Sequence, residues 1–210
     1  MDIDLAAISP GEGYRLLTSI IVPRPVAWVT TIGEDGTINA APFSFFNMLG
    51  SDPPIVAIGV GNRPEGTPKD TARNAEARGE FVVNLVDEPL AAKMNITAVP
   101  FPYGQSEITE AELTAVPSLR VTPPRIAQAP ASLECRLREY LRIGENNVLI
   151  GEVLAIAIRD DLVGPDGRFL TENAALIGRM HGGGGYVRTS DRFRLDRLSL
   201  AEWQERKSAE

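Results

Sequence analysis

The stretch PRPVAWVTTIGEDGTINAA, residues 23–41, decides the architecture of the chain. Val26 to Ile32 is rich in β-branched and aromatic residues, which predicts a strand. The sequence GEDG at residues 33–36 is a strong turn signal, and residues 37–41 then read as the returning strand. We therefore expect an antiparallel hairpin whose two open ends lie near each other.

Polar and aromatic side chains gather at the open end of this hairpin. Arg24 stands between two prolines, which fix the backbone and present its guanidinium from a stiff platform. Ser44 stands among Phe43, Phe45 and Phe46, where a hydroxyl needs a hydrogen-bond partner. These residue types at one rim predict a site for a planar, anionic ligand.

A third feature is a helix start further along the chain. Thr67 is a candidate N-cap, Pro68 suits the first helical position, and Asp70 completes a capping box. Lys69 and Thr71 would then lie in the first turn, beside free N–H groups and the positive end of the helix dipole. This predicts an anion site, although both residues are also compatible with a solvated helix surface.

Further elements follow from capping and turn signals. A capping box at Ser9 predicts a short helix to about Thr18. The helix that begins at Thr67 should end near Arg78, with Gly79 after it. We expect strands at residues 55–60 and 81–86, a helix at residues 87–97, and a short helix that begins at Thr109 within an irregular region.

The last third of the chain predicts two long strands and a loop. Residues 132–143 alternate, which places Leu133, Cys135, Leu137, Leu141 and Ile143 on one face. Residues 148–158 form the partner strand, and Gly151 within it is typical of a bulge. Residues 176–186 are expected to form a glycine-rich loop. Antiparallel hairpins with a few helices imply a closed or nearly closed barrel.

Composition excludes several classes of protein. The 210 residues are 43% apolar and 23% charged, which suits one ordinary globular domain. The net charge of −7 argues against nucleic-acid and anionic-membrane partners. Cys135 is the single cysteine and is expected in the core. The acidic N-terminus lacks signal-peptide features and no run spans a membrane, so we expect a cytoplasmic protein.

No motif for side-chain catalysis is present in the sequence. Residues 61–66 begin and end with glycine but lack the Lys-Ser/Thr of a phosphate-binding loop, and no dinucleotide-binding glycine motif follows a strand. There is no nucleophile elbow, and no histidine, cysteine and carboxylate cluster indicates a metal. We therefore predict no catalytic side chain and no metal ligand.

Several segments together resemble the flavin reductase-like family: PRPVAWVTT, NAAPFSFFN, DPPIVAIGV, KDTARN, FVVNLV and IGR-x-x-GGGGY. The resemblance extends from about Tyr14 to Phe193, nearly the whole chain. It implies the FMN-binding split β-barrel, an antiparallel, Greek-key-like and mainly β fold with helical decoration. It also implies one domain over residues 1–210, with its core at about 14–193, and a homodimer with FMN near the subunit interface.

The resemblance also implies which residues bind the cofactor. It places the FMN phosphate at the helix start and a glycine-rich segment near the flavin ring. The implied cofactor-binding residues are Arg24, Pro25, Thr30, Thr31, Ser44, Phe45, Phe46, Asn47, Lys69, Asp70, Thr71, His181 and Tyr186. Asn47 is expected at the pyrimidine edge, and Asp70 is expected to cap the helix and not to touch phosphate. Only one of Thr30 and Thr31 is expected to face the flavin, because successive strand residues point to opposite sides.

Alternatives stay open for these residues and for the activity. Arg24 can instead form a structural ion pair, Ser44 can bond the backbone, and the phenylalanines can belong to the core. The resemblance implies an NAD(P)H:flavin oxidoreductase that passes hydride to FMN N5 and electrons onward to flavin, oxygen or a redox partner protein. An FMN-binding electron carrier with little NAD(P)H activity and a non-catalytic ligand-binding barrel are the alternatives.

Overall fold

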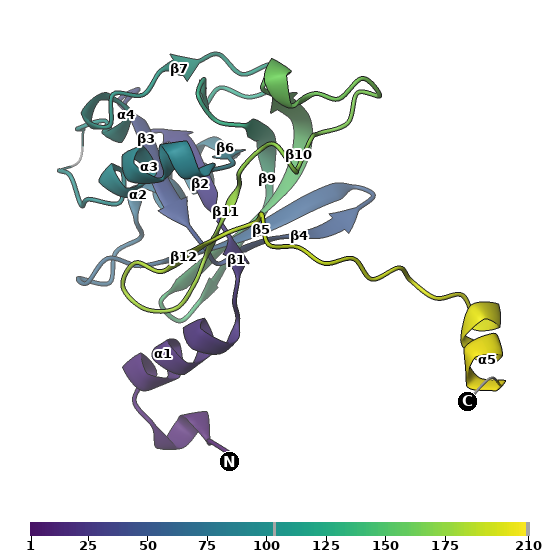
Figure 1. The fold of residues 1–210 in the computed structure, drawn as a ribbon. Coiled ribbons are helices and arrows are strands. Elements are labelled where there is room, and N and C mark those ends of the chain that lie inside the picture. Colours follow the sequence, from purple (N-terminus) through teal and green to yellow (C-terminus); the bar gives the residue numbers. More distant parts are fainter. Residues whose placement is uncertain (103, 209–210) are drawn as a thin grey trace.

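The computed structural model describes residues 1–102 and 104–208, and an antiparallel sheet forms its centre (Figure 1). Seven strands run in the order β3-β2-β6-β9-β10-β5-β4. In chain order they are β2 Ala27–Ile32, β3 Ile38–Phe43, β4 Phe46–Ser51, β5 Pro54–Gly61, β6 Glu80–Asn84, β9 Ala131–Ile143 and β10 Asn146–Ile158.

Two small sheets and several short helices complete the fold. The small sheets are β1-β11-β12, with bounds Arg24–Pro25, Ile177–Arg179 and Tyr186–Arg188, and β7-β8, with bounds Ala115–Val116 and Arg125–Ile126. The α-helices are α1 Pro10–Ile20, α2 Asp70–Arg78, α3 Ala91–Ile96, α4 Glu107–Glu110 and α5 Leu200–Ser208. The 3-10 helices are η1 Leu5–Ala7, η2 Glu88–Leu90 and η3 Asp160–Leu162.

The hairpin predicted from residues 26–41 is confirmed. β2 pairs antiparallel with β3, and the backbone N–H of Gly33 donates to the Thr37 carbonyl at 2.8 Å. Gly36 has φ 86°, a left-handed conformation that glycine adopts without steric cost. At the open end, Arg24 Nε lies 3.3 Å from Ser44 Oγ, so the two ends meet as expected.

Two predicted helix ends are also confirmed. At α1, the Ser9 hydroxyl accepts the N–H of Glu12, and the Glu12 carboxylate accepts the N–H of Ser9. At the end of α2, Gly79 has φ 71° and its N–H bonds the Ala75 carbonyl. Short-range capping chemistry therefore determines both boundaries.

Gly151 marks a bulge, as predicted, and the bulge changes the faces of the neighbouring strand. Gly151 pairs with Leu137 and Ile150 pairs with Glu139, which leaves Arg138 without an opposite residue. A Cβ at Gly151 would lie 2.4 Å from Phe81 Cζ, so no larger residue fits. The predicted single apolar face is therefore wrong beyond the bulge: Leu141 and Ile143 are exposed, and Tyr140 packs against the core.

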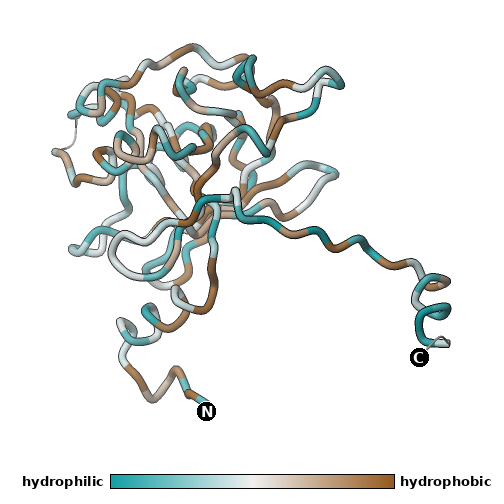
Figure 2. Tube along the Cα trace, viewed as in Figure 1, coloured by the Kyte–Doolittle hydropathy of each residue, from teal (hydrophilic) through white to brown (hydrophobic). Residues whose placement is uncertain are grey.

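β2 is buried on both faces because it separates two apolar clusters. Ala27 and Val29 join the first cluster, with Ile58, Phe81 and Leu149 among its members. Trp28 joins the second, and its indole N–H donates to Thr97 Oγ1 at 2.9 Å. Figure 2 shows apolar residues gathered where the strands cross at the centre. Cys135 lies in the first cluster as expected, and burial raises the pKa of its thiol.

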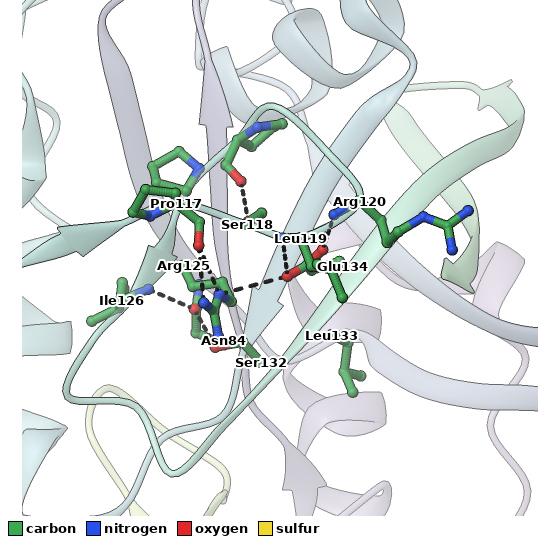
Figure 3. Close-up of polar contacts among 12 residues, drawn as sticks. Asn84, Pro117, Ser118, Leu119, Arg120, Arg125, Ile126, Ser132, Leu133 and Glu134 are labelled. Carbon is green, nitrogen blue, oxygen red and sulfur yellow. Dashed lines mark hydrogen bonds and ion pairs between the residues drawn. The ribbon is translucent and has the colours of Figure 1, made fainter. Parts of the chain in front are cut away.

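Residues 97–102 and 104–130, called the excursion below, are tied to the sheet by two buried polar side chains (Figure 3). Asn84 Oδ1 accepts the backbone N–H of Ile126 at 2.9 Å and the Ser132 hydroxyl at 2.8 Å. The Glu134 carboxylate accepts the N–H groups of Leu119 and Arg120 at 2.9 and 2.6 Å. These bonds hold the part of the excursion around residues 119–126 against the sheet.

Two local predictions are wrong. The short helix does not begin at Thr109: α4 begins at Glu107, and Glu112 has φ 49°, beyond the helix end. Its position follows from the sheet edge, since the Ser106 hydroxyl donates to the Ile38 carbonyl of β3 at 2.6 Å. Residues 176–186 are not all loop, because β11 and β12 pair as a hairpin around residues 180–185.

Residues 190–208 form a C-terminal arm that leaves the body of the molecule and ends in α5 (Figure 1). Along the arm, apolar and polar residues alternate (Figure 2). Phe193 and Leu195 are 87% and 84% exposed, and Trp203 is 48% exposed. Within the described residues, no helix combines the length and apolar character needed to cross a membrane.

Candidate functional site

A cleft of about 450 Å³ lies where β3, the start of α2 and the excursion meet, and we call it the Lys69 cleft. Its volume falls in the usual range for small-molecule sites. Its wall contains apolar and charged groups from four segments of the chain. The lining residues are Asn39, Ala41, Pro42, Phe43, Arg63, Pro64, Glu65, Lys69, Asp70, Thr71, Thr97, Ala98, Val99, Pro100, Phe101 and Glu107.

The predicted capping box at the start of α2 is wrong. α2 begins at Asp70, and Lys69 occupies the N-cap position without a side-chain cap. Thr67 is held in a turn, since the N–H of Arg63 donates to its carbonyl and its hydroxyl donates to Glu65. Asp70 forms ion pairs with Arg63 and Arg73 instead of closing a box.

This arrangement leaves donors free at the start of α2. The N–H groups of Ala72 and Arg73 donate to the Lys69 carbonyl. The N–H groups of Asp70 and Thr71 lie before the first of these bonds, so they have no carbonyl partner within the helix. The Lys69 ammonium lies 5.9 Å from the centroid of the Phe43 ring and forms no ion pair within the described residues. Free N–H groups and an unpaired ammonium favour binding of an anion.

The floor of the Lys69 cleft is a buried hydrogen-bond network. Asn39 Nδ2 donates to Thr71 Oγ1 at 3.0 Å and to Thr31 Oγ1 at 3.4 Å. Asn74 Nδ2 donates to the same Thr31 hydroxyl at 3.2 Å. The network fixes Asn39 and Thr71 at the cleft surface, while Thr31 lies behind them.

One carboxylate, Glu107, lies buried in the wall of the same cleft. The residue is 8% exposed, and Glu107 Oε2 accepts the N–H of Ala40 on β3 at 2.9 Å. Burial raises the pKa of this carboxyl; the bond from Ala40 opposes the rise, and the charge of Asp70 adds to it. Arg63 favours the charged form of Glu107 but is already paired with Asp70.

A second hollow, of about 910 Å³, lies on α1, β1 and the β3–β4 connection, and we call it the Arg24 groove. It contains six of the residues implied as cofactor-binding. These are Arg24, Pro25, Ser44, Phe45, Phe46 and Asn47. The implied residues therefore divide between two sites, because only Lys69, Asp70 and Thr71 line the Lys69 cleft.

Arg24 is committed to protein atoms. Its Nη1 donates to the carbonyls of Thr18 at 2.9 Å and Ile21 at 2.6 Å, and its Nη2 donates to the Met180 carbonyl at 3.2 Å. Its Nε reaches Ser44, and its guanidinium lies 5.9 Å from the Phe45 ring centroid. Arg24 thus joins α1, the β3–β4 connection and the β11–β12 hairpin by hydrogen bonds, and within the described residues it does not form the ion pair that stood as the alternative.

The remaining implied residues line neither hollow. Thr30 and Thr31 are both fully buried, and the Thr30 hydroxyl donates to the Pro124 carbonyl. His181 and Tyr186 are exposed on the β11–β12 hairpin, where Arg179 lies 4.9 Å from the Tyr186 ring centroid. In a single chain, neither residue belongs to the Lys69 cleft.

Sequence reasoning missed several residues of the Lys69 cleft. Arg63 and Glu65 lie in the loop before α2, whereas Glu107 and residues 97–101 come from the excursion. Arg63 could have been predicted as an ionic partner of Asp70, because it lies only seven residues before that carboxylate in the chain. No sequence pattern places Glu107 beside β3, since the excursion has little regular structure.

The family model described as the flavin reductase like domain matches residues 19–174 of the chain. The chain belongs to the flavin reductase-like family. As a member, it is 45% identical over 208 residues to a protein of Deinococcus radiodurans, a match that covers 96% of this chain and 92% of that protein.

Solved structures of this family resemble the chain over nearly its full length. Nitrilotriacetate monooxygenase component B from Bacillus cereus is 34% identical, with a TM-score of 0.88 and coverage of 93% of this chain and 98% of that one. The 2-nitrobenzoate 2-nitroreductase NbaA of Pseudomonas fluorescens is also 34% identical, with a TM-score of 0.86 and coverage of 95% and 98%. The flavin reductase-like split barrel predicted from the sequence is confirmed.

Proposed function

We propose that the protein is an FMN-dependent oxidoreductase that takes hydride from NAD(P)H, with FMN in the Lys69 cleft. The observation that carries the proposal is the Lys69 ammonium beside the first N–H groups of α2, all without an ionic or hydrogen-bond partner among the described residues, within a cleft of ligand size. Membership of the flavin reductase-like family makes a flavin the cofactor to which this anion site is best suited.

The residues of the Lys69 cleft fit the parts of FMN. Lys69 and the first N–H groups of α2 would hold the phosphate, which prefers charge-assisted donors. Asn39 and Thr71, fixed by their mutual hydrogen bond, would face the polar sugar chain. Pro42, Phe43 and Phe101 offer apolar surface for a flat ring.

Bound FMN would supply the hydride acceptor, because a nicotinamide passes hydride to flavin N5. The chain's own residues would bind and orient the flavin and exclude water from one of its faces. No proton-transferring side chain is required for the hydride step.

Anaerobic absorption spectroscopy tests this function. Purified protein saturated with FMN should lose its flavin absorbance on addition of NADH or NADPH, and free FMN at equal concentration should not over the same time. Bleaching no faster than that of free FMN would remove NAD(P)H from the proposal. Rapid reduction by a redox protein would then favour the electron-carrier alternative.

Similarity to the nitroreductase NbaA favours a second candidate, in which electrons pass from FMN to a nitroaromatic compound. The apolar wall of the Lys69 cleft and the Arg24 groove both offer surface for an aromatic ring. Reoxidation of the reduced protein should then be faster with 2-nitrobenzoate than with benzoate of equal concentration. Equal rates would leave flavin, oxygen or a redox protein as acceptor.

We further propose a homodimer in which the C-terminal arm packs against a second copy. Phe193 and Leu195 would gain burial there that their own chain does not provide. The β11–β12 hairpin lines no part of its own chain's Lys69 cleft, so it would approach the flavin only from the partner. In that arrangement His181 and Tyr186 would face the flavin of the partner.

The dimer should persist at micromolar concentration and depend on the arm. The double variant F193S/L195S should weaken it at least tenfold, since each buried apolar side chain contributes roughly 1.5–3 kcal/mol. Analytical ultracentrifugation across a dilution series measures the change. Arg194→Ser, at the exposed position between them, is the matched control and should have little effect. A full-length, FMN-saturated protein that sediments only as monomer would contradict the dimer.

The loop at residues 180–185 should control access to the flavin and not flavin binding. A Cβ at Gly183 or Gly184 would meet no atom within 4 Å, so alanine fits sterically and reduces only flexibility. The double alanine variant should slow reduction by NAD(P)H about three- to tenfold, with FMN affinity within about threefold. Stopped-flow reduction checks both values, with Gly11→Ala as control because its Cβ is equally unobstructed. Loss of FMN with normal reduction at saturation would place the loop in the cofactor site.

A further inference from the structure

Glu107 is a buried carboxylate that the proposed hydride transfer does not use. It is 8% exposed in the wall of the Lys69 cleft and forms no ion pair within the described residues. Among the described residues, its bond to another element comes from the N–H of Ala40, on the edge strand of the sheet. This bond does not require Glu107 to be ionised, because an oxygen of the neutral carboxyl can accept the Ala40 N–H in the same geometry.

The charges that face Glu107 come from the segments packed against α4. β3 contributes none, since residues 38–43 carry no ionisable side chain. α2 contributes Asp70, and the preceding loop contributes Arg63, which is paired with Asp70. Across the cleft lie Lys69 and Glu65, and α4 itself carries Glu110 on its exposed side.

A phosphate bound beside Lys69 would bring as many as two negative charges into the environment of Glu107. Lys69 compensates part of that charge, but Arg63 and Arg73 are occupied by Asp70. A buried carboxylate near a second anion favours its neutral form, because like charges repel strongly where water is excluded. Uptake of one proton would remove this repulsion and keep the Ala40 bond.

We propose that Glu107 couples FMN binding to proton uptake, so that the Lys69 cleft takes the phosphate with Glu107 neutral. The inference rests on the proposed function, since it needs FMN in this cleft. The sign of the effect follows directly. At low pH Glu107 is already neutral and opposes nothing, whereas FMN affinity falls as pH rises through the pKa of Glu107. That pKa is raised in the free protein by burial and would rise further in the complex.

The variant Glu107→Gln tests this coupling because its amide oxygen can still accept the Ala40 N–H. Titration calorimetry with FMN, in buffers of different ionisation enthalpy, measures the protons taken up on binding. We expect the wild type to take up about half a proton more than E107Q, at a pH between the pKa values of free and bound Glu107. At pH 8 we expect E107Q to bind FMN about tenfold more tightly, with the two affinities converging at low pH.

Two controls separate this role from others. Glu110→Gln, on the exposed side of α4, should take up protons as the wild type does. Riboflavin lacks the phosphate, so the difference between wild type and E107Q should nearly vanish with it. The ionisation of free FMN in solution is the same in every titration and cancels in the comparison.

The possible failures are distinguishable. Equal proton uptake by wild type and E107Q, with FMN bound by both, would overturn the coupling and leave the proposed function intact. If E107Q changed the affinity for riboflavin as much as the affinity for FMN, the phosphate would not be the source of the coupling. Absence of FMN binding by the wild type would overturn the proposed function and this inference together.

Discussion

Lys69→Ala is expected to weaken FMN binding about 10- to 150-fold while leaving riboflavin binding nearly unchanged. A charge-assisted contact to phosphate contributes roughly 1.5–3 kcal/mol. Riboflavin lacks the phosphate, so it does not make this contact and has nothing to lose in the variant. The fold should be unaffected, because Lys69 is exposed and its side chain makes no cap for α2. Fluorescence quenching titrations of both flavins provide the two dissociation constants.

The matched control for this prediction is Arg168→Ala. Arg168 lies in the loop between η3 and β11, its side chain is 86% exposed, and it does not line the Lys69 cleft. The same charge is removed, so a general electrostatic effect on an anionic ligand would appear in both variants. An FMN dissociation constant unchanged by Lys69→Ala would mean that this ammonium is merely solvated.

Glu134→Ala is expected to destabilise the protein by about 3 kcal/mol, since removal of this buried carboxylate leaves the N–H groups of Leu119 and Arg120 without their acceptor and Arg125 without its ionic partner. The Glu134 side chain is 1% exposed, accepts the N–H groups of Leu119 and Arg120, and lies 3.5 Å from Arg125 Nε (Figure 3). Urea denaturation measures the loss. Amide hydrogen exchange should accelerate at Leu119 and Arg120 before the sheet opens.

Glu139→Ala on the same strand is the control for this substitution. Glu139 is exposed, so its loss should change the free energy of unfolding by less than about 0.5 kcal/mol. Equal stability of the two variants would show that Glu134 does not fix the excursion. Because the excursion supplies Glu107 and one wall of the Lys69 cleft, Glu134→Ala should also weaken FMN binding.

Much of the fold was predictable because it depends on neighbouring residues. The turn at Gly36, the capping box at Ser9 and the helix end at Gly79 each rest on contacts within a few positions. The bulge at Gly151 was also predictable, because glycine inside a long strand is typical of a bulge. The effect of the bulge on the residues that follow was not predictable, because the face to which Leu141 points depends on which strand carries the extra residue.

The candidate site was predictable only in part, because tertiary contacts decide where its residues lie. Thr67 has the sequence of an N-cap, but the chain is held in a turn there and the helix begins at Asp70. Arg24 and Lys69 suggested one anionic site, yet three backbone carbonyls and the Ser44 hydroxyl take four of the five N–H donors of Arg24. Glu107 reaches the cleft through an irregular region whose path depends on distant buried side chains.

The central claim is that FMN occupies the Lys69 cleft with its phosphate at the start of α2. A crystal structure of the protein grown with FMN tests it most directly. We expect phosphate density within hydrogen-bond distance of Lys69 Nζ and the Thr71 N–H, with the ring beside Pro42 and Phe43. Flavin density in the Arg24 groove, with an empty Lys69 cleft, would contradict the account.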